Sequence, residues 1–381
     1  MTVHSLRRTG AVTMSGLLIA ALTACGSNEQ AETNDPAETG PAADGETSTE
    51  GDAAGQAGEG ESFAIALLLP ESKTTRYEAF DRPLFEAAIA EQCPECTVIY
   101  SNADQDPAQQ QEQAESALAQ GIDVMVLDVV DATAGEAIVN NAKGQGVPVV
   151  AYDRLVAGAD YYVSFDNAAV GELQAQTLLD MLEAEGTTSG DLVMINGSPT
   201  DGNAALFKEG AHGVFDASEF NIVAEFDTPD WSPDAAQQWM EGQLSALDMD
   251  SVVGVYAAND GTAGGAVTAM KGGGIEPLPP VTGQDAELAG IQRIVAGDQA
   301  LTIYKAIVPE AEDAATAALA LARGETPESS TELEGVPSTL LDPVAVTADN
   351  IMDTVVADGF YTVEDICTAE YADACAELGI E

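Results

Sequence analysis

Basic residues are scarce in this chain of 381 residues. It contains 12 Lys and Arg against 65 Asp and Glu, which gives a formal net charge of −53 at pH 7. Such a surface repels nucleic acids and anionic lipids, so polyanionic partners are excluded. The acidity suits a salt-tolerant organism or simply a soluble acidic exported protein, and the sequence leaves both open.

The few bases that remain are informative, because surface positions have largely gone to Asp and Glu. Arg76, Arg82, Arg154 and Lys305 remain in the main part of the chain, three of them at or just after a predicted strand end. Solvated surface charge is the ordinary explanation for such residues. The planar fork of Arg can also hold two vicinal hydroxyls or orient a carboxylate that does so.

Histidine and cysteine are rare as well. His4 lies in the N-terminal segment and His212 stands alone, so we predict neither a metal site nor a cofactor. Cys93 and Cys96 form one close pair, and Cys367 and Cys375 form another. In an exported protein such pairs more often form disulfides than metal sites. A redox-active Cys93/Cys96 is the alternative, disfavoured because the pair follows a predicted helix instead of opening one.

The N-terminal apolar run, Ala11 to Ala21, is too short to span a bilayer but suits the core of a signal peptide. Leu22-Thr23-Ala24-Cys25 resembles a bacterial lipobox, which implies that residues 1–24 are removed and that lipid is attached to Cys25. An ordinary secretory signal with a chance cysteine is the alternative. Arg7-Arg8 only hints at twin-arginine export, so the export route stays open.

Residues 25–61 are expected to be a lipidated cysteine followed by a disordered acidic tether. Gly26 to Glu61 contains no aromatic residue, no aliphatic residue larger than Ala and no base, so it cannot bury enough apolar surface to fold. At about 5–6 Å × √n such a chain reaches roughly 30–36 Å, which would hold a folded domain clear of a membrane.

From Phe63 onward, strand and helix patterns alternate. Strands are expected at 63–69, 97–100, 122–127, 147–152, 161–165, 192–195, 222–226, 252–256, 281–282 and 301–304. Helical patterns lie between most of them, including 77–91, 107–121 and 134–143. Strict alternation indicates parallel sheets covered by helices on both faces. The sequence therefore predicts an α/β fold of two doubly wound lobes.

The stretch from Val147 to Gln174 contains two predicted strands, 147–152 and 161–165, each followed by charged or amide side chains. The link between them lacks the ten or more helical residues that a parallel crossover requires. We therefore expect the chain to leave one sheet and enter another here. Polar groups at strand ends facing such a switch indicate a ligand cleft between two lobes.

Polar residues recur at the predicted strand ends. They are Arg76, Asp153, Arg154, Asp166, Asn167, Asn203, Asn259, Asp260, Gln284, Asp285 and Lys305. Each alone is weak, since Asn and Asp commonly cap helices and turns, and Asp260 could be merely an N-cap. Together they suit a neutral sugar, which also favours an aromatic face. Trp231 is the natural stacking ring, with packing under a loop as the alternative, and Tyr77 could oppose it.

Seven segments carry a specific resemblance. They are AYDR (151–154), SFDNAAVGELQAQ (164–176), NGSPTDGNAALF (196–207), DWSPDAA (230–236), ANDGTAGGA (258–266), GQDAELAGIQRI (283–294) and TIYK (302–305). In this order they closely resemble the ribose/galactose-type periplasmic binding proteins of bacterial ABC importers, in particular the D-xylose-binding members. The resemblance runs from about Phe63 to Tyr361.

The resemblance implies a type I periplasmic binding protein fold, with two Rossmann-like lobes joined by a three-crossover hinge that closes on one sugar. The lobes would be 62–157 plus 306–340 and 158–305 plus 341–381. The residues that it implies as ligand contacts are Arg76, Tyr77, Asp153, Arg154, Asn167, Asn203, Trp231, Asp260, Asp285 and Lys305, with Lys305 at a hinge.

Three departures concern specificity. Tyr77 stands where the xylose-binding members have Trp, Gly202 replaces an Asn beside Asn203, and Ala306 follows Lys305 where Pro is expected. These positions bear on which sugar is bound more than on the class of ligand.

The leading interpretation is a lipid-anchored, monomeric sugar receptor on the outer face of the cytoplasmic membrane, which binds a monosaccharide, most simply D-xylose, and delivers it to an ABC permease. A sensor with the same fold that signals to a membrane receptor is one alternative. An exported glycosidase using two of the Asp residues is another, disfavoured because no nucleophile motif is present. Related sugar-responsive repressors are excluded by the export signal and the lack of a basic DNA-reading helix.

Overall fold

The computed structural model describes residues 60–380. The predicted signal peptide, Cys25 and all of the predicted tether except Gly60 and Glu61 lie outside these residues. Within residues 60–380, no helix combines the length and the apolar character needed to cross a membrane.

The first lobe is built on a seven-stranded sheet in the order β10-β11-β5-β4-β3-β1-β2. Its strands are β1 (Ala64–Leu69), β2 (Thr97–Asn102), β3 (Val124–Leu127), β4 (Val149–Tyr152), β5 (Tyr161–Phe165), β10 (Thr331–Leu333) and β11 (Val336–Leu341). All neighbours pair in parallel except β10, which runs antiparallel to β11 at the edge. The central strands are apolar and buried on both faces, as parallel sheets require.

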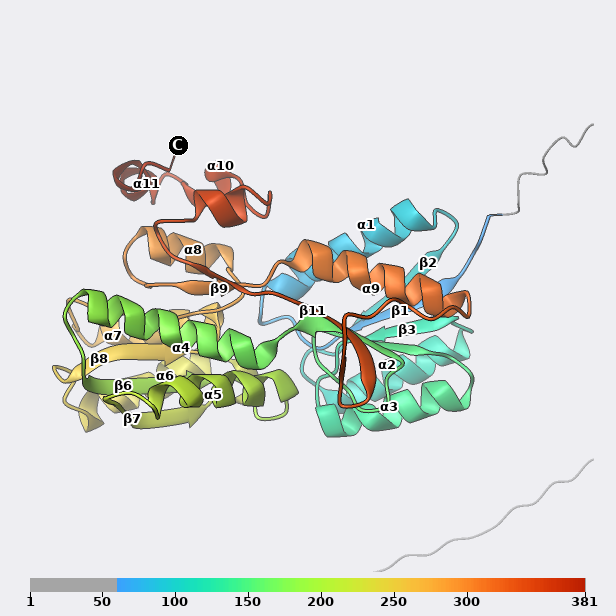
Figure 1. Ribbon diagram of the computed structural model, residues 1–381, viewed down its shortest axis with the longest axis horizontal. Helices are drawn as coiled ribbons and strands as arrows, with labels where there is room; N and C mark the ends of the chain where they lie inside the picture. The colour runs from blue at the N-terminus through green and yellow to red at the C-terminus, as the bar shows by residue number, and fades with distance from the viewer. Residues whose placement is uncertain (1–59, 381) are drawn as a thin grey trace, which may run out of the picture. The chain divides into compact units, whose positions relative to one another are not determined.

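Helices cover both faces of this sheet (Figure 1). On one face lie α1 (Arg82–Gln92) and α9 (Ile307–Ala322), and on the other α2 (Pro107–Ala119) and α3 (Ala132–Gly144). The start of α2 is fixed as predicted, because the side chain of Asp106 accepts from the Ala108 and Gln109 amides and Pro107 fills the first turn.

The prediction that the chain changes sheets between 147–152 and 161–165 is wrong. β4 and β5 are parallel neighbours in the first sheet, with Val150 opposite Tyr161. The strands are so short that the connection at 153–160 returns to the start of β5 without a helix, since extended chain spans about 3.3 Å per residue. The first lobe therefore continues past residue 157 to the end of β5.

The second lobe holds the remaining strands and most of the remaining helices. They are α4 (Asn167–Ala184), β6 (Gly190–Asn196), α5 (Gly202–Phe215), β7 (Phe220–Asp227), α6 (Pro233–Ala246), β8 (Val252–Ala257), α7 (Asp260–Gly272), α8 (Leu288–Val295), β9 (Thr302–Tyr304) and β12 (Val344–Val346). Parallel strands run in the order β7-β6-β8. Single bridges, Val255 to Val281 and Gln284 to Ile303, link β8 to β9, which pairs antiparallel with β12.

Helices α4 and α5 approach closely because glycines lie at their contact. An added Cβ at Gly171 would come within 2.0 Å of the Phe207 carbonyl oxygen, and one at Gly210 within 2.1 Å of the Ala168 carbonyl oxygen. This close packing places the N-terminal end of α5, which carries several polar side chains, against the first lobe.

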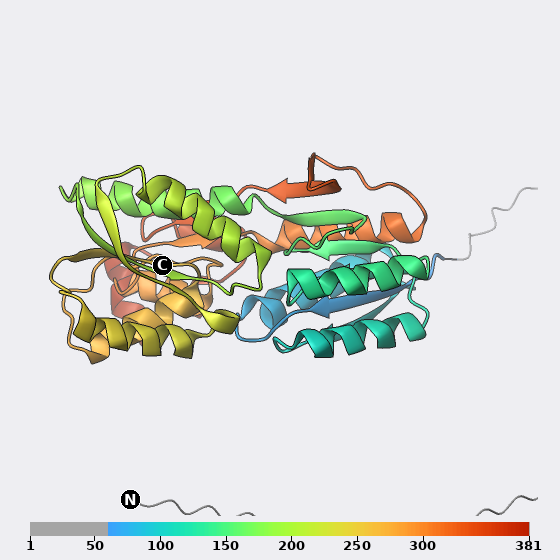
Figure 2. The same ribbon diagram turned by 90° about the horizontal axis from the view of Figure 1, so that it is seen from below.

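The chain passes between the lobes three times. It crosses from β5 to α4, from β9 to α9 and from β11 to β12. β5 and β11 are paired neighbours, so the first and third crossings lie side by side (Figure 2).

The last part of the chain returns to the second lobe. After a single π-helical turn at Met352–Val356, the short helices α10 (Val363–Ile366) and α11 (Ala372–Leu378) pack on α8 (Figure 1). Cys367 is bonded to Cys375, and Cys93 to Cys96, which are the two disulfide pairs expected from the cysteine spacing.

Candidate functional site

A cavity lies between the carboxyl ends of the strands of the two lobes. Its lining comes from both lobes and from the β9–α9 crossing. The lining residues are Thr74, Arg76, Tyr77, Asp153, Arg154, Asp201, Asn203, Phe207, Trp231, Asn259, Gln284, Asp285 and Lys305. All of the predicted contact residues except Asn167 and Asp260 are among them.

The carboxylate of Asp153 is the centre of the charged network in this cavity. Its Oδ1 accepts from Arg76 Nη1 at 3.1 Å and from Lys305 Nζ at 3.2 Å, and its Oδ2 accepts from the Tyr77 hydroxyl at 3.4 Å. Burial disfavours the charged form, but Arg76, Lys305 and Arg154 together outweigh burial and hold the pKa of Asp153 below its ordinary value.

The backbone of Asp153 is held in an unusual conformation. Its φ is 54°, in the left-handed region that non-glycine residues rarely adopt. Its carbonyl oxygen accepts from the Tyr162 hydroxyl at 3.0 Å, the Ser164 hydroxyl at 2.6 Å and Asn203 Nδ2 at 2.9 Å. These three donors fix the turn after β4 and direct the Asp153 side chain into the cavity.

Two further carboxylates bind the Arg76 guanidinium and fix its position. It forms a two-pronged contact with Asp81, through Nε at 2.9 Å and Nη2 at 2.7 Å, and Nη2 also contacts Glu310 at 2.8 Å. Glu310 lies on α9 and is fully buried, so desolvation raises its pKa. Arg76 therefore presents a fixed guanidinium edge toward Asp153.

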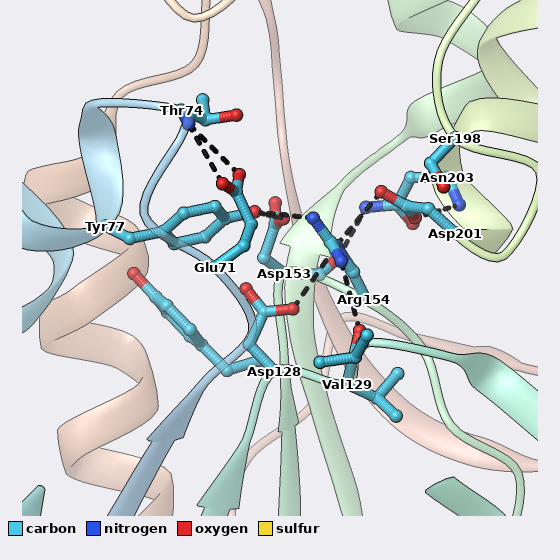
Figure 3. A network of polar contacts seen from close by, with 12 residues as sticks. Glu71, Thr74, Tyr77, Asp128, Val129, Asp153, Arg154, Ser198, Asp201 and Asn203 are labelled. Carbon is cyan, nitrogen blue, oxygen red and sulfur yellow. Dashed lines mark hydrogen bonds and ion pairs between the residues drawn. The ribbon is translucent and has the colours of Figure 1, made fainter. Parts of the chain in front are cut away.

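Arg154 links the two lobes (Figure 3). In the first lobe it donates to the Val129 carbonyl at 3.2 Å and to the Tyr77 hydroxyl at 3.0 Å. Its Nε lies 3.5 Å from Asp128 and 3.0 Å from Asp201 of the second lobe. Asp128 is fully buried and neither of its oxygens has a hydrogen-bond partner, so burial raises its pKa well above the ordinary value.

The second lobe contributes the N-terminal end of α5 and the turn after β7. Asp201 caps α5, accepting from the Asn203 amide at 2.9 Å, and its other oxygen accepts from Trp231 Nε1 at 3.0 Å. The Trp231 ring packs over Gly197, where an added Cβ would lie 2.0 Å from the indole. Trp231 thus lines the cavity as predicted, and Phe207 lies beside it with ring centroids 6.4 Å apart.

Lys305 lies at the second crossing, between β9 and α9. Its Nζ is 3.2 Å from Asp153 and 3.5 Å from Asp285, so it faces one carboxylate from each lobe. The same nitrogen lies 5.5 Å from the centre of the Phe165 ring and 5.6 Å from that of Phe207. Lys305 is 3% exposed.

Asn167 and Asp260 lie next to the cavity but do not line it. Asp260 is fully buried, and its carboxylate accepts from Gln299 Nε2 at 2.6 Å, the Glu287 amide at 2.8 Å and the Thr302 hydroxyl at 3.0 Å. Because these bonds occupy both carboxylate oxygens, the structure gives Asp260 a supporting position in place of the predicted ligand contact.

Asn167 has a similar position under the first crossing. Its Nδ2 lies 3.4 Å from both the Tyr162 and the Ser164 hydroxyls, the same hydroxyls that hold the Asp153 carbonyl. We conclude that Asn167 supports the Asp153 turn instead of lining the cavity.

The sequence reasoning did not select five of the lining residues, although Asn259 and Gln284 stood among the polar strand ends. Thr74, Asp201 and Phe207 were missed altogether. Asp201 and Phe207 could have been found from Asn203, since one precedes it by two residues and the other follows it by four on the same helix. Arg82, in contrast, is a surface residue that pairs with Glu78 and Glu86.

The lobes touch at the rim of the cavity. The Thr75 amide of the first lobe donates to Glu287 Oε1 of the second at 3.0 Å, and Lys73 lies 3.7 Å from Asp230. Burial raises the pKa of Glu287 to about 7. Together with the Arg154–Asp201 and Asn203–Asp153 contacts, these bonds connect the two lobes around the cavity.

The cavity is polar, balanced in charge and aromatic. Arg76, Arg154 and Lys305 face the carboxylates of Asp153, Asp201 and Asp285, while Tyr77, Phe207 and Trp231 supply the aromatic faces. Among residues 60–380, no group of His, Cys, Asp or Glu side chains has the arrangement of a metal site. Such a lining suits a small neutral ligand with many hydroxyls.

Comparison with known proteins gives concordant matches. A family model described as the periplasmic binding protein domain matches residues 65–326. The D-xylose-binding periplasmic protein of Escherichia coli is 35% identical over 312 residues, covering 79% of this chain and 92% of that protein. The protein of the same name from Haemophilus influenzae is 39% identical over 279 residues, covering 71% and 82%. A carbohydrate transporter solute-binding protein from Chloroflexus aurantiacus, solved with D-glucose, matches with a TM-score of 0.73 at 29% identity, covering 80% and 98%.

Proposed function

Because this chain belongs to the periplasmic binding protein domain family, we propose that it is the sugar-binding component of an ABC importer and that its ligand is D-xylose. The observation that carries the proposal is the closed, charge-balanced cavity, in which planar polar groups and aromatic rings from two lobes converge. The relatives are sugar-binding transport proteins, so the expectation that the chain is not an enzyme is confirmed for its family.

The lining of the cavity supports a monosaccharide, because it combines charged and amide side chains with aromatic rings. D-Xylose is favoured because two relatives that cover most of the chain carry its name. Tyr77, which lines the cavity, is where this chain would differ in sugar preference, whereas Gly202 is not among the lining residues.

Ligand capture would use hinge motion at the three crossings. In an open form the contacts Thr75–Glu287, Arg154–Asp201 and Asn203–Asp153 would be broken and the cavity walls exposed to water. A sugar that bridges Asp153 and Lys305 on one side and Trp231 on the other would favour closure, since it binds the closed form better. The closed surface would then be presented to the permease.

The chain would act as a monomer outside the cytoplasmic membrane, anchored by lipid on Cys25. This part of the proposal is supported by the lipobox-like sequence Leu22-Thr23-Ala24-Cys25 and by the acidic composition of residues 26–61. Labelling of expressing cells with a radioactive fatty acid should mark the wild-type protein and leave Cys25→Ala unlabelled. Equal labelling of both would refute the anchor.

Titration calorimetry of the chain from Gly26 onward tests the ligand. We expect micromolar or tighter binding of D-xylose, with D-ribose, D-galactose, D-glucose and L-arabinose as competitors. Lys305→Met should abolish the heat, while Lys271→Met, a surface control, should leave it unchanged, because Lys271 is half exposed and pairs with Asp298. Tight binding of another sugar would support a sugar receptor and refute D-xylose as its ligand. If none of the five sugars bound, the proposed function would be refuted.

A further inference from the structure

An aromatic cluster joins the two lobes outside the sugar cavity. We call its four members, Phe80, Tyr304, Phe360 and Tyr361, the aromatic clasp. The Phe80 and Phe360 rings are stacked with centroids 4.1 Å apart, and Tyr361 meets the edge of Phe80 at 5.6 Å. Tyr304 lies 5.2 Å from Phe360. Phe80 belongs to the first lobe, whereas Phe360 and Tyr361 belong to the C-terminal segment that packs on the second.

The clasp is directly connected to the cavity. Phe80 lies in the same π-helical turn, Tyr77–Asp81, as the lining residue Tyr77. Tyr304 immediately precedes Lys305, which lines the cavity from the β9–α9 crossing. Phe360 therefore touches two segments that carry ligand-facing side chains, one in the first lobe and one at the hinge.

The C-terminal side of the clasp is fixed firmly to the second lobe. Gln292 of α8 donates to the carbonyl oxygens of Asp365 and Ile366, at 3.2 and 3.4 Å. The disulfide between Cys367 and Cys375 closes the segment that carries α10 and α11, and Cys375 is buried against the same apolar cluster as α8. A segment held in this way resists movement relative to the second lobe.

We propose that Phe360 is a positioning residue, and that the aromatic clasp holds the lobes in the arrangement that binds ligand. This inference rests on the proposed sugar-binding function. Rotation of the first lobe away from the second would separate Phe80 from Phe360 and expose both rings to water, which is unfavourable. The clasp therefore raises the closed fraction of the ligand-free protein, and the apparent dissociation constant falls because it is inversely proportional to that fraction.

Replacement of Phe360 by Leu tests this role in the full chain from Gly26. The matched control is Phe226→Leu, because Phe226 stacks on Trp239 within the second lobe, with centroids 5.2 Å apart. We expect Phe360→Leu to weaken D-xylose binding about tenfold and to raise the radius of gyration of the ligand-free protein in small-angle scattering. Saturating D-xylose should restore the wild-type radius. Phe226→Leu should lower the unfolding temperature while leaving both other quantities unchanged.

A second pair of variants removes the disulfides one at a time. Cys367→Ser with Cys375→Ser should also weaken D-xylose binding, whereas Cys93→Ser with Cys96→Ser should not, because Cys93 caps the C-terminal end of α1, at the other end of that helix from Phe80. The clasp is refuted if Phe360→Leu and Phe226→Leu share the wild-type affinity and ligand-free radius. Should the wild type bind none of the sugars, the proposed function fails, and the ligand-free radius alone decides whether the clasp controls closure.

Discussion

Replacing Gly197 by Ala should displace the Trp231 indole without deleting it. An added Cβ would lie 2.0, 2.3 and 2.5 Å from three carbons of the ring, far inside van der Waals contact. The backbone of Gly197 is not in the left-handed region, so Ala is compatible with its conformation. The strain must therefore be relieved by movement of the Trp231 ring, which is only 5% exposed and lines the cavity.

The expected loss of affinity can be worked out from two contacts. The displaced ring loses its hydrogen bond to Asp201, and bonds to charged groups contribute about 1.5–3 kcal/mol. It also loses its aromatic face toward the ligand, for which about 0.5–1.5 kcal/mol is typical. Because part of the first loss also destabilises the ligand-free protein, we expect sugar affinity to fall by about 1–3 kcal/mol, or roughly 5- to 150-fold.

Fluorescence and calorimetry together provide the assay. The chain contains two Trp residues, so Trp239→Phe leaves Trp231 as the reporter of its own position. In that background, Gly197→Ala should shift the Trp231 emission and weaken D-xylose binding. Gly242→Ala in α6 is the matched control, since its added Cβ meets nothing within 4 Å and it does not line the cavity. If both variants bind D-xylose as the wild type does and the emission is unshifted, Trp231 is not a ligand contact and the argument fails.

Three further predictions concern charge, pH and packing. Lys305→Met leaves Asp153 and Asp285 without their shared cation, so the free energy of unfolding measured in urea should fall by roughly 3 kcal/mol. The surface control Lys271→Met should lower it by less than about 1 kcal/mol, and equal losses in the two variants would contradict the prediction. Burial raises the pKa of Glu287 from 4.5 to about 7. The protonated form of Glu287 therefore stabilises the folded state below about pH 4.5, and this stability is lost as the pH rises to 7. Glu287→Gln should flatten the decline of the unfolding free energy with pH by up to about 1.4 kcal/mol per pH unit, and a slope equal to that of the wild type would refute this prediction. Gly171→Ala should lower the thermal midpoint of unfolding because its added Cβ meets the Phe207 backbone. Gly213→Ala, whose added Cβ meets nothing within 4 Å, should raise the stability by up to about 1 kcal/mol. If Gly171→Ala were the more stable of the two variants, the close packing of α4 and α5 would be refuted.

Much of the cavity could be predicted because parallel strands end at a common edge. Asp153 and Lys305 directly follow strands, Asp285 follows the bridge at Gln284, and Asn203 lies in the first turn of α5; the fold gathers such positions whatever their separation in sequence. The same reasoning predicted a ligand contact at Asp260, which does not line the cavity. A carboxylate at a strand end can face the ligand or hold neighbouring loops, and only the positions of Gln299 and Thr302 decide between the two.

Other features were beyond the sequence because they depend on distant partners. Arg76 is fixed by Glu310, 234 residues away, and no local pattern marks that pair. The β4–β5 connection was misjudged because the minimum length of a parallel crossover assumes strands of ordinary length, and here the strand is only four residues long. Phe360 and Tyr361 lie outside the seven segments that carry the family resemblance and beyond residues 65–326, which the family model matches, so the resemblance gave no reason to expect Phe360 at the lobe interface.

The charge composition acquires a physical meaning once the cavity is known. Arg76, Arg154 and Lys305 are the buried basic residues among those that the structure describes, and all three line the cavity. Each is matched by a carboxylate within 3.5 Å, so none of the three cations is left unpaired in a chain whose net charge is −53. The acidic surface repels anionic ligands from the entrance, and the cavity offers them no uncompensated cation. A neutral sugar meets neither barrier and can exchange hydroxyl hydrogen bonds with both members of each ion pair, because each hydroxyl both donates and accepts.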